Sequence, residues 1–517
     1  MPEIDEPASG NTFMYPDLMT EVWHEWGLVV KPKVLEFRKR FTVKTYCKNV
    51  DLSDPQLIYD AIWNYMHDKR GKQQVISFFS RWTGRPCNEV KYLLVNACNP
   101  VYISNLKKSG VSKEEAQYVY DSGWAFFNSV SKEIATEMAE NVKNRTVREH
   151  VLLRKYREEV IRYLEITDTG SGKRRKLGLE CLIFRLYEAV ANVAAEPLFD
   201  AKVGEFQVAS IKNKGQKYGR KTIKRWLSRD PDGTKFGCKA DVKKCYPSID
   251  HDVLRTMLNR DIHKADDLRY LFDTIIDLYE EFPDPQNIDH KKGILIGSPV
   301  SKDLCNYYVS KLYHYACEKL AKVKKRRGKT QRVRLLSHMM IYMDDIQIYG
   351  SNKRDIQEAM KLIVKYAAEE LKLVIKPNWR KFRSMYRDKT GRTRGCLLDF
   401  MGFRFHGGEV IQKNYYGRIV RYRKVWITIR DNTFIRARRK FFRFERMIKR
   451  KHIVSYKFAK SLTSYYGCFT QTDSVSFRKD NKIDQLMRIA RRIVSDYAKS
   501  QPYLIEMYYK MWRCKCA

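Results

Sequence analysis

The sequence predicts an α+β protein, because a central region with strand signals lies between two helical regions. Residues 55 to 165 carry apolar side chains at intervals of three and four with few Gly or Pro, as in EEAQYVYDSGWAFFNSVSKEIATEMAENV, which is typical of amphipathic helices. Three strand-like runs separated by helical segments follow, and the pattern after residue 430 is helical again. The 517 residues suffice for two to four domains of ordinary size.

The N-terminal region, residues 1–150, is predicted to be a helical extension with nearly balanced charge, because it holds 20 basic and 19 acidic residues. It shows no pattern of side chains that points to chemistry. The pattern changes at Glu158, where EVIRYLEIT, the turn-like DTGSG and KRRKLGLE predict a two-stranded hairpin with a basic tip. FRLYEAVANVAAEPLFD then returns to a helical period.

The three strand-like runs carry polar residues that a purely structural strand does not need. They are KFGCKADVKKCYPSID, RVRLLSHMMIYMDDIQIYG and LLDFMGFRF. Two segments between them, SKDLCNYYVSKLYHYACEKLAKV and RDIQEAMKLIVKYAAEELKL, are predicted to be helices.

The charge of the chain indicates a polyanionic partner. Against 60 acidic residues stand 100 Lys and Arg, a net charge of +40, and residues 411–517 alone hold 27 basic and 7 acidic residues. The twelve cysteines are scattered without a CxxC pair, which is typical of reduced thiols. Because no apolar run approaches the 18 or so residues that span a bilayer, we expect a soluble, cytoplasmic protein without a membrane partner.

Asp344 and Asp345 stand between the apolar runs IYM and IQI. Buried charges persist only when they are paired or bound to metal, so the two carboxylates either occupy an exposed turn or hold cations. Asp241 ends another strand-like run, KFGCKAD, and favours the second alternative. Three carboxylates from two strands can hold the two Mg²⁺ ions of a phosphoryl-transfer site, since oxygen ligands suit magnesium.

At this point the residues resemble a known family. IYMDDIQIYG resembles motif C of reverse transcriptases, Tyr-x-Asp-Asp on a β-hairpin, and ADVKKCYPSID resembles motif A of the bacterial members. GILIGSPVSKDLCNYY is similar to motif B, and LDFMGFRF to the Phe-x-Gly primer grip. EITDTGSGKRRKLGLECLIFRLYEAV and QVASIKNKGQKYG resemble fingers elements, and SLTSYYGCFTQTDS resembles a thumb helix of retron and intron relatives.

The resemblance implies a right-hand polymerase with fingers, an antiparallel palm sheet covered by helices, and a helical thumb. We therefore expect fingers at 151–235, a palm with some fingers elements at 236–410 and a basic helical thumb at 411–517, all preceded by the helical extension at 1–150.

The resemblance also assigns the catalytic residues. Asp241, Asp344 and Asp345 become the metal carboxylates, with the backbone carbonyl of Val242 as a further ligand of the two Mg²⁺ ions. Tyr246 becomes the steric gate that excludes a 2′-hydroxyl and so favours deoxynucleotides, the alternative being an ordinary core tyrosine.

Gly297, Ser298 and Pro299 are expected to begin the motif B helix against the nascent base pair, with Ser298 as N-cap and Pro299 in the first turn. A Gln often precedes this Gly in the family, whereas this chain has Ile296, which leaves fidelity and nucleotide preference open.

Basic residues of the fingers are expected to reach the triphosphate of the nucleotide, because ammonium and guanidinium groups neutralise its charge; a solvated tip is the alternative. These residues are Lys173, Arg174 and Arg175. Lys376 or Lys381 is a candidate for the proton donor of motif D.

The basic tail interleaves aromatic residues with Arg and Lys, as in RIVRYRKVWITIR and RARRKFFRFERMIKRK. Cations bind phosphates and aromatic rings stack on bases, although most of these rings can instead pack inside amphipathic helices. We expect a nucleic-acid contact at Arg436, Arg438, Arg439 and Lys440.

Together these features predict an RNA-directed DNA polymerase that uses an RNA template and dNTPs to make cDNA. The long extension and basic tail resemble the defence-associated, abortive-infection reverse transcriptases, which act against phage, some with a structured noncoding RNA. Alternatives are a catalytically weak RNA-binding scaffold and a diversity-generating or retron-type enzyme. Met343 and Tyr246 argue against a viral RNA-dependent RNA polymerase, which usually carries Gly at the first position. The sequence leaves open whether the protein forms a homo-oligomer.

Overall fold

A computed structural model describes residues 46–48, 50–153, 159–167, 174–285, 289–326, 328–384, 386–387, 390, 393–396, 398–413 and 415–500. These residues fall into two compact units, of which one is represented by residues 321–333 and the other by the remaining described chain.

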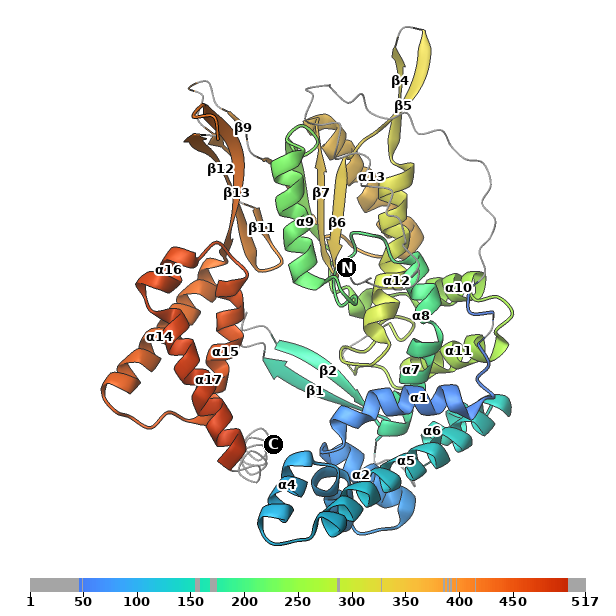
Figure 1. The fold of residues 1–517 in the computed structure, drawn as a ribbon. Helices are drawn as coiled ribbons and strands as arrows, with labels where there is room; N and C mark the ends of the chain where they lie inside the picture. The colour runs from blue at the N-terminus through green and yellow to red at the C-terminus, as the bar shows by residue number, and fades with distance from the viewer. Residues whose placement is uncertain are drawn as a thin grey trace, which may run out of the picture. The chain divides into compact units, whose positions relative to one another are not determined.

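The N-terminal extension predicted at 1–150 is helical from residue 55 (Figure 1), while residues 1–45 lie outside the described residues. Asp54 accepts a hydrogen bond from the backbone of Gln56 and so caps the first helix, while Ser112 and Glu115 form a capping box at the start of the longest one. The stacked rings of Phe79 and Phe127, 5.9 Å apart, join two of these helices. The helices are α1 (Pro55–Met66), α2 (Gln73–Thr83), α3 (Cys87–Lys91), α4 (Pro100–Lys108), α5 (Lys113–Lys143) and α6 (Val147–Leu152).

The predicted fingers hairpin is present as an antiparallel pair, in which Ile161 lies opposite Glu180 and Thr167 opposite Arg174. Its tip, residues 168–173, lies outside the described residues. Three helices follow the hairpin, and the first of them is buried over most of its surface. The elements are β1 (Ile161–Thr167), β2 (Arg174–Glu180), α7 (Leu182–Ala194), α8 (Glu196–Lys202) and α9 (Gly215–Arg229).

The central sheet has four strands in the order β6-β7-β3-β8, with antiparallel pairing between neighbours. Met340 and Tyr349 pack with side chains of α9, whereas Ile346 and Ile348 belong to the core shared with the helices on the opposite face. Figure 1 shows α9 on one side of β6 and β7 and α12 and α13 on the other. The strands are β3 (Phe236–Asp241), β6 (His338–Tyr342), β7 (Asp345–Gly350) and β8 (Arg380–Arg383); the helices are α10 (His251–Asp261), α11 (Asp266–Glu281), α12 (Ser301–His314) and α13 (Lys353–Leu371).

One predicted helix is shorter than expected. The segment 301–323 is helical only as far as His314, continues as a π-helical turn, Tyr315–Lys319, and then enters the β4 (Ala321–Arg326) and β5 (Lys329–Arg334) hairpin. The hairpin belongs to the smaller unit. Like charges three and four residues apart destabilise a helix, and the run KVKKRR would place them so. Gly328, with φ of 75°, provides the turn.

A three-stranded sheet, β11 (Leu398–Phe400), β12 (Phe403–Lys413) and β13 (Ile419–Ile429), follows the palm. The predicted primer-grip segment forms its first hairpin, with φ of 53° at Met401 and 82° at Gly402. Two short strands, β9 (Tyr386–Arg387) and β10 (Thr393–Arg394), precede it. Residues 411–429, placed in a helical thumb by the sequence, instead complete the β12–β13 hairpin, because β-branched and aromatic residues alternate there with basic ones.

The chain is helical from Asp431 onward, as predicted for the region after residue 430. These helices have their own apolar core around Phe441, Phe444 and Phe469. They are α14 (Asp431–Lys449), α15 (Tyr456–Thr470), α16 (Val475–Asp480) and α17 (Ile483–Ser500). Asp473 ties this region to the sheet, because its backbone N–H donates to the Ile427 carbonyl across 2.8 Å and its carboxylate accepts from the Ile427 N–H across 2.7 Å.

Among the described helices, none combines the length and apolar character that crossing a bilayer requires.

Candidate active site

The three predicted catalytic carboxylates belong to one end of the central sheet. Asp241 ends β3 and Asp345 begins β7, and the two residues are direct partners in the antiparallel register. Asp344 precedes Asp345 in the turn from β6 to β7, and its carbonyl accepts a 2.8 Å hydrogen bond from the Val242 N–H. Both faces of these strands are buried, because Met340 and Tyr349 belong to one apolar core and Ile346 and Ile348 to another, so a slip by one residue would exchange the side chains of the two cores.

The turn that carries Asp344 has a strained backbone. Because Tyr342 pairs with Asp345, the turn contains two residues, Met343 and Asp344. Met343 has φ of 54°, a conformation that costs a non-glycine residue about 1–2 kcal/mol. The buried strand residues Ile341 and Ile346 on either side hold the turn in place.

Two lysines lie against the carboxylates. Lys376 forms an ion pair with Asp241, and its backbone N–H donates to the Asp241 carbonyl across 2.9 Å. The Lys239 ammonium lies 3.6 Å from Asp345 and donates a 3.0 Å hydrogen bond to the Asp399 carbonyl in β11. The strand alternation places Lys239 on the same side of β3 as Asp241. Because Lys239 precedes Asp241 by two residues in a predicted strand, the sequence alone could have identified it as a neighbour of the site.

The electrostatics of Asp345 reflect this crowding of charge. Burial raises the pKa of its carboxyl group above the ordinary value, and the negative charges of Asp344 and Asp241 raise it further, whereas Lys239 opposes the shift. The raised pKa of Asp345 therefore reflects first its burial and only then the two neighbouring carboxylates.

The chemistry of these donors suits a hard divalent cation, because the carboxylates and the Val242 carbonyl offer only oxygen ligands. None of the described residues donates a backbone hydrogen bond to that carbonyl. In the described arrangement, however, no three His, Cys, Asp or Glu side chains converge closely enough to hold one ion. Lys239 and Lys376 form ion pairs with Asp345 and Asp241. They thus neutralise part of the negative charge that a bound metal ion would neutralise.

Tyr246 lies beside the same turn. It begins a single 3-10 turn, Tyr246–Ser248, after motif A, and its hydroxyl donates a hydrogen bond to the Met343 sulfur across 3.7 Å. Burial raises the pKa of the phenol, with smaller contributions from nearby groups that include Asp344. The predicted gate is therefore half-buried: it packs against the apolar core and contacts the turn of Asp344 through Met343.

The predicted start of the motif B helix is wrong by about one turn. Helix α12 begins at Ser301 with Val300 in the N-cap position, and the side chain of Ser298 lies before it. Ser298 is buried, and its hydroxyl accepts from the Val300 N–H across 3.3 Å. Gly297 has φ of 107°, so the backbone turns sharply before Pro299 can enter a helix.

A buried acid that the sequence analysis missed lies behind this loop. The Tyr279 hydroxyl donates to the Glu188 carboxyl group across 2.5 Å and lies 3.3 Å from the Ser298 hydroxyl. Burial raises the pKa of Glu188 well above its ordinary value, and Glu180 adds to the shift. Glu188 stands in the apolar helix α7, where a single charged residue on a buried face was the available signal.

The fingers hairpin approaches the motif B loop closely. A Cβ at Gly178 in β2 would lie 2.7 Å from a terminal methyl group of Leu295, so a larger residue there would require the leucine side chain to shift. Of the basic residues predicted to bind the triphosphate, Arg174 is 75% exposed and lies 3.8 Å from Glu165. Lys173 lies outside the described residues, as does the side chain of Arg175.

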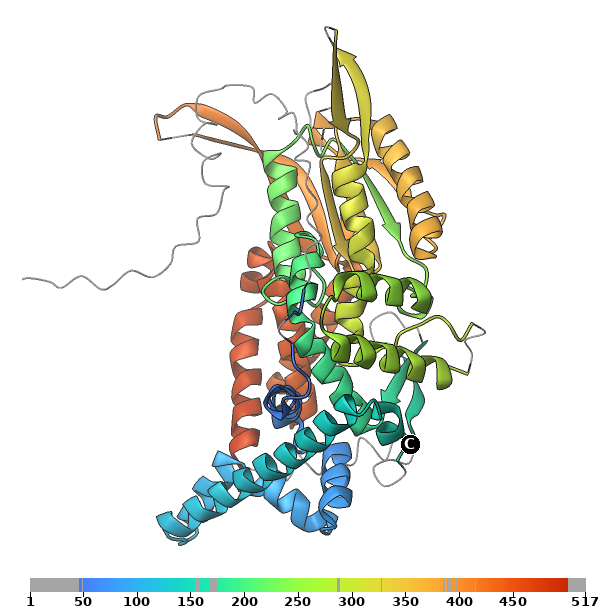
Figure 2. The same cartoon turned by 90° about the vertical axis from the view of Figure 1, so that its right-hand side faces the viewer.

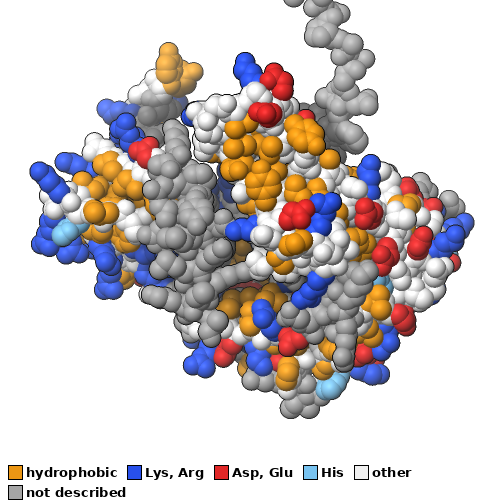
Figure 3. Space-filling model, turned by 90° about the horizontal axis from the view of Figure 1, so that it is seen from below, with side chains coloured by type: hydrophobic (Ala, Val, Ile, Leu, Met, Phe, Trp, Pro, Cys, Tyr) orange, Lys and Arg blue, Asp and Glu red, His pale blue; other side chains and the backbone are white. Residues whose placement is uncertain are grey.

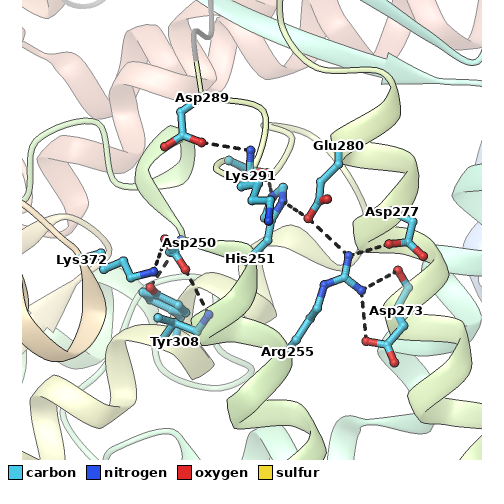
Figure 4. A network of polar contacts seen from close by, with 12 residues as sticks. Asp250, His251, Arg255, Asp273, Asp277, Glu280, Asp289, Lys291, Tyr308 and Lys372 are labelled. Carbon is cyan, nitrogen blue, oxygen red and sulfur yellow. Dashed lines mark hydrogen bonds and ion pairs between the residues drawn. The ribbon is translucent and has the colours of Figure 1, made fainter.

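A polar network supports the segment that follows motif A (Figure 4). Asp250 caps α10 through the Val253 N–H and forms a 3.0 Å ion pair with Lys372. His251 is buried between the Glu280 carboxylate, 3.0 Å away, and the Gly293 carbonyl, 2.7 Å away. The network thus links motif A to the loop before motif B.

The four cations predicted to bind nucleic acid lie on α14, whose inner face packs through Ala437, Phe441 and Phe444. Figure 3 shows Lys and Arg side chains gathered over the C-terminal helices, the region predicted to be the thumb. Three of the four are exposed, and the fourth, Lys440, is half-buried with its ammonium over the Tyr465 ring. The set is Arg436, Arg438, Arg439 and Lys440.

Comparison with known proteins identifies the domain that carries this site. Residues 166–405 match the family model described as reverse transcriptase (RNA-dependent DNA polymerase), and this part contains all three carboxylates, Tyr246 and the motif B loop. No curated protein matches the chain significantly. The reverse transcriptase domain indicates an RNA-directed DNA polymerase, which is a nucleotidyltransferase.

Proposed function

We propose that the protein makes cDNA by two-metal nucleotidyl transfer, with Asp241, Asp344 and Asp345 as the metal ligands. The observation that carries the proposal is the register of β3 and β7, which sets Asp241 opposite Asp345 beside the turn of Asp344 within the reverse transcriptase domain. Reverse transcriptases generally use divalent metals. Two Mg²⁺ ions, when bound, would activate the primer hydroxyl and neutralise charge on the leaving pyrophosphate.

Lys376 is the better candidate for the motif D proton donor. Its ammonium contacts Asp241, whereas the Lys381 ammonium donates a 2.7 Å hydrogen bond to Gln357 on α13. With a cation held at Asp241, the Lys376 ammonium would be released from this ion pair and would donate its proton to the leaving pyrophosphate. Tyr246 selects deoxynucleotides from its position beside Met343, and Gly297 and Ser298 lie against the new base pair.

Primer extension tests this function. The purified protein is given a primer on an RNA template, Mg²⁺ and the four dNTPs, and we expect a DNA product complementary to the template. EDTA and the Asp344→Asn variant are the controls that should yield none. A protein that binds the template but makes no DNA under any divalent metal would instead be an RNA-binding scaffold.

We also propose, on the resemblance to abortive-infection enzymes, a role in antiphage defence with a structured noncoding RNA as partner. Sequencing the nucleic acid that copurifies with the protein, together with any DNA made on it, tests the partner. Plaque counts on bacteria carrying wild type or Asp345→Asn test the role. One enriched structured RNA and protection lost in the variant are expected; a random RNA population with no protection would contradict the proposal.

A further inference from the structure

The outer half of the β12–β13 hairpin projects from the body of its unit (Figure 2). An 11-residue strand is about 36 Å long, so the hairpin reaches well beyond the sheet from which it starts. At the base, Phe403, Phe405 and Ile427 are buried against α9 and the central sheet. Every residue whose side chain is described from Ile411 to Val420 is exposed.

Aromatic and aliphatic side chains are concentrated at this exposed end. Tyr415 is 97% and Tyr416 80% exposed, with their rings 5.5 Å apart and nearly perpendicular. Ile411, Ile419 and Val420 beside them are also exposed. Exposed apolar groups of this density mark a contact surface more often than a solvated turn.

The charge of the same segment is entirely positive. Residues 411–424 contain five basic residues and no acidic one. Lys413 lies opposite Ile419 in the strand register, and Ile411 lies opposite Arg421, so each of these cross-strand pairs joins an apolar and a basic residue. A polyanion with flat apolar groups along it matches this combination.

We propose that this hairpin tip, residues 411–424, binds single-stranded nucleic acid, with Tyr415 and Tyr416 stacking on unpaired bases and Lys413 and Arg418 contacting phosphates. Tyrosine rings stack on bases only where these are not already paired in a helix, and the cations follow the backbone. A second copy of the chain is a poor occupant, because two tips of uniform positive charge repel each other. The proposal rests on the proposed function, whose template and product offer such strands.

Fluorescence anisotropy with the full-length protein tests the proposal. The probes are a labelled 20-nucleotide oligouridine and a labelled 20-base-pair RNA duplex. The double variant Tyr415→Ala, Tyr416→Ala should bind the single strand about tenfold more weakly, with the salt dependence unchanged. The double variant Tyr415→Phe, Tyr416→Phe keeps the rings and should bind as wild type does. Tyr118→Ala, which removes a tyrosine 75% exposed on α5, is the matched control.

The cations are tested in the same assay. The double variant Lys413→Gln, Arg418→Gln should lower the slope of log affinity against log salt by about 1.4, the value for two phosphates of a single strand. Lys107→Gln with Lys108→Gln, an exposed pair on α4, should leave the slope unchanged.

Two results would overturn the proposal. One is wild-type affinity for the oligouridine in the tyrosine-to-alanine variant; the other is an equal loss for duplex and single strand in both tyrosine variants. Two further measurements would reassign the tip to another partner and so also overturn the proposal: a change confined to the elution volume of the protein, or a change confined to binding of phosphatidylserine vesicles. The binding assay requires no DNA synthesis. If the wild type makes no DNA, the proposed function is refuted, but the binding result still tests the proposal for the hairpin tip.

Discussion

The Tyr246 hydroxyl donates a hydrogen bond to the Met343 sulfur, 3.7 Å away, and so connects motif A to the turn that carries Asp344. Met343 has the backbone conformation that glycine adopts most easily, yet it supplies a side chain on which Tyr246 rests. The contact joins the turn of Asp344 to an aromatic ring that also packs against the apolar core.

Tyr246→Val should admit ribonucleotides, because the smaller side chain opens the space that a 2′-hydroxyl needs. We expect the preference for dNTPs over rNTPs, measured as the ratio of kcat/KM values in primer extension, to fall about tenfold or more. Tyr246→Phe keeps the ring but loses the contact with Met343, and it should keep the preference. Equal use of both nucleotides by the wild type would contradict the gate.

Asp345→Asn should stabilise the metal-free protein at neutral pH. Burial and the neighbouring carboxylates raise the pKa of Asp345, so the folded protein holds this proton more tightly than the unfolded chain does. The ionised form therefore costs stability above the raised pKa, and the cost disappears as the pH falls toward the ordinary value of 3.8. Urea unfolding in EDTA measures the difference between variant and wild type.

Mg²⁺ provides the control for that experiment, since it should stabilise the wild type more than the variant. A wild type that is the more stable of the two at pH 7 in EDTA would show that the ion pair with Lys239 outweighs the burial of Asp345, contrary to this account.

Acidification from pH 6.5 to 4 should destabilise the contact between the N-terminal extension and the fingers. His150 on α6 lies 2.7 Å from the Tyr187 hydroxyl on α7, and burial lowers the pKa of His150 from 6.5 to about 4. Below pH 6.5 His150 takes up a proton in the unfolded chain before it does so in the folded protein. The free energy of unfolding therefore decreases as the pH is lowered, by about 3 kcal/mol at most.

Urea unfolding at pH 7, 6, 5 and 4.5 measures this slope. His150→Gln should flatten it, while His452→Gln, at an exposed thumb position, should not. Equal slopes in His150→Gln and wild type would assign the pH dependence to other groups.

The thumb cations should contribute to nucleic-acid affinity through phosphate contacts. Replacing Arg436, Arg438, Arg439 and Lys440 with Gln should lower the slope of log affinity against log salt by up to about 3 for single-stranded RNA. Metal binding at the carboxylates should be unchanged. The control variant replaces four exposed lysines of the N-terminal extension, Lys107, Lys108, Lys113 and Lys143. If the variant at Arg436, Arg438, Arg439 and Lys440 has the slope of the wild type, these four cations do not contact phosphates.

Much of the site could be predicted because a buried strand is recognisable from a short apolar run in the sequence. The apolar runs around Asp344 and Asp345 and the run before Asp241 predict adjacent buried strands, and the pairing of these strands then sets Asp241 opposite Asp345. The fingers hairpin and the Met401–Gly402 turn were recognisable for the same reason.

Other features depend on contacts that the sequence does not display. Ser298 has the chemistry of an N-cap, but the left-handed backbone at Gly297 delays the helix to Ser301, so its hydroxyl joins Tyr279 and the Val300 N–H instead. The burial of Glu188 on α7 depends on α11, whose Tyr279 donates a hydrogen bond to it, and the sequence does not show this contact. The strands after residue 411 were obscured by their high content of Arg and Lys.

The most direct test of the catalytic site is the single-turnover rate at which one dNTP is added to a primer on an RNA template in Mg²⁺. We expect Asp344→Asn and Asp345→Asn each to lose at least about a thousandfold of this rate while remaining folded and retaining primer–template affinity, because each removes a charge that would hold the metal pair. Asn352→Ala, which removes the N-cap side chain of α13, is the control variant and should keep most of the rate. Rates near wild type in both aspartate variants would contradict the assignment.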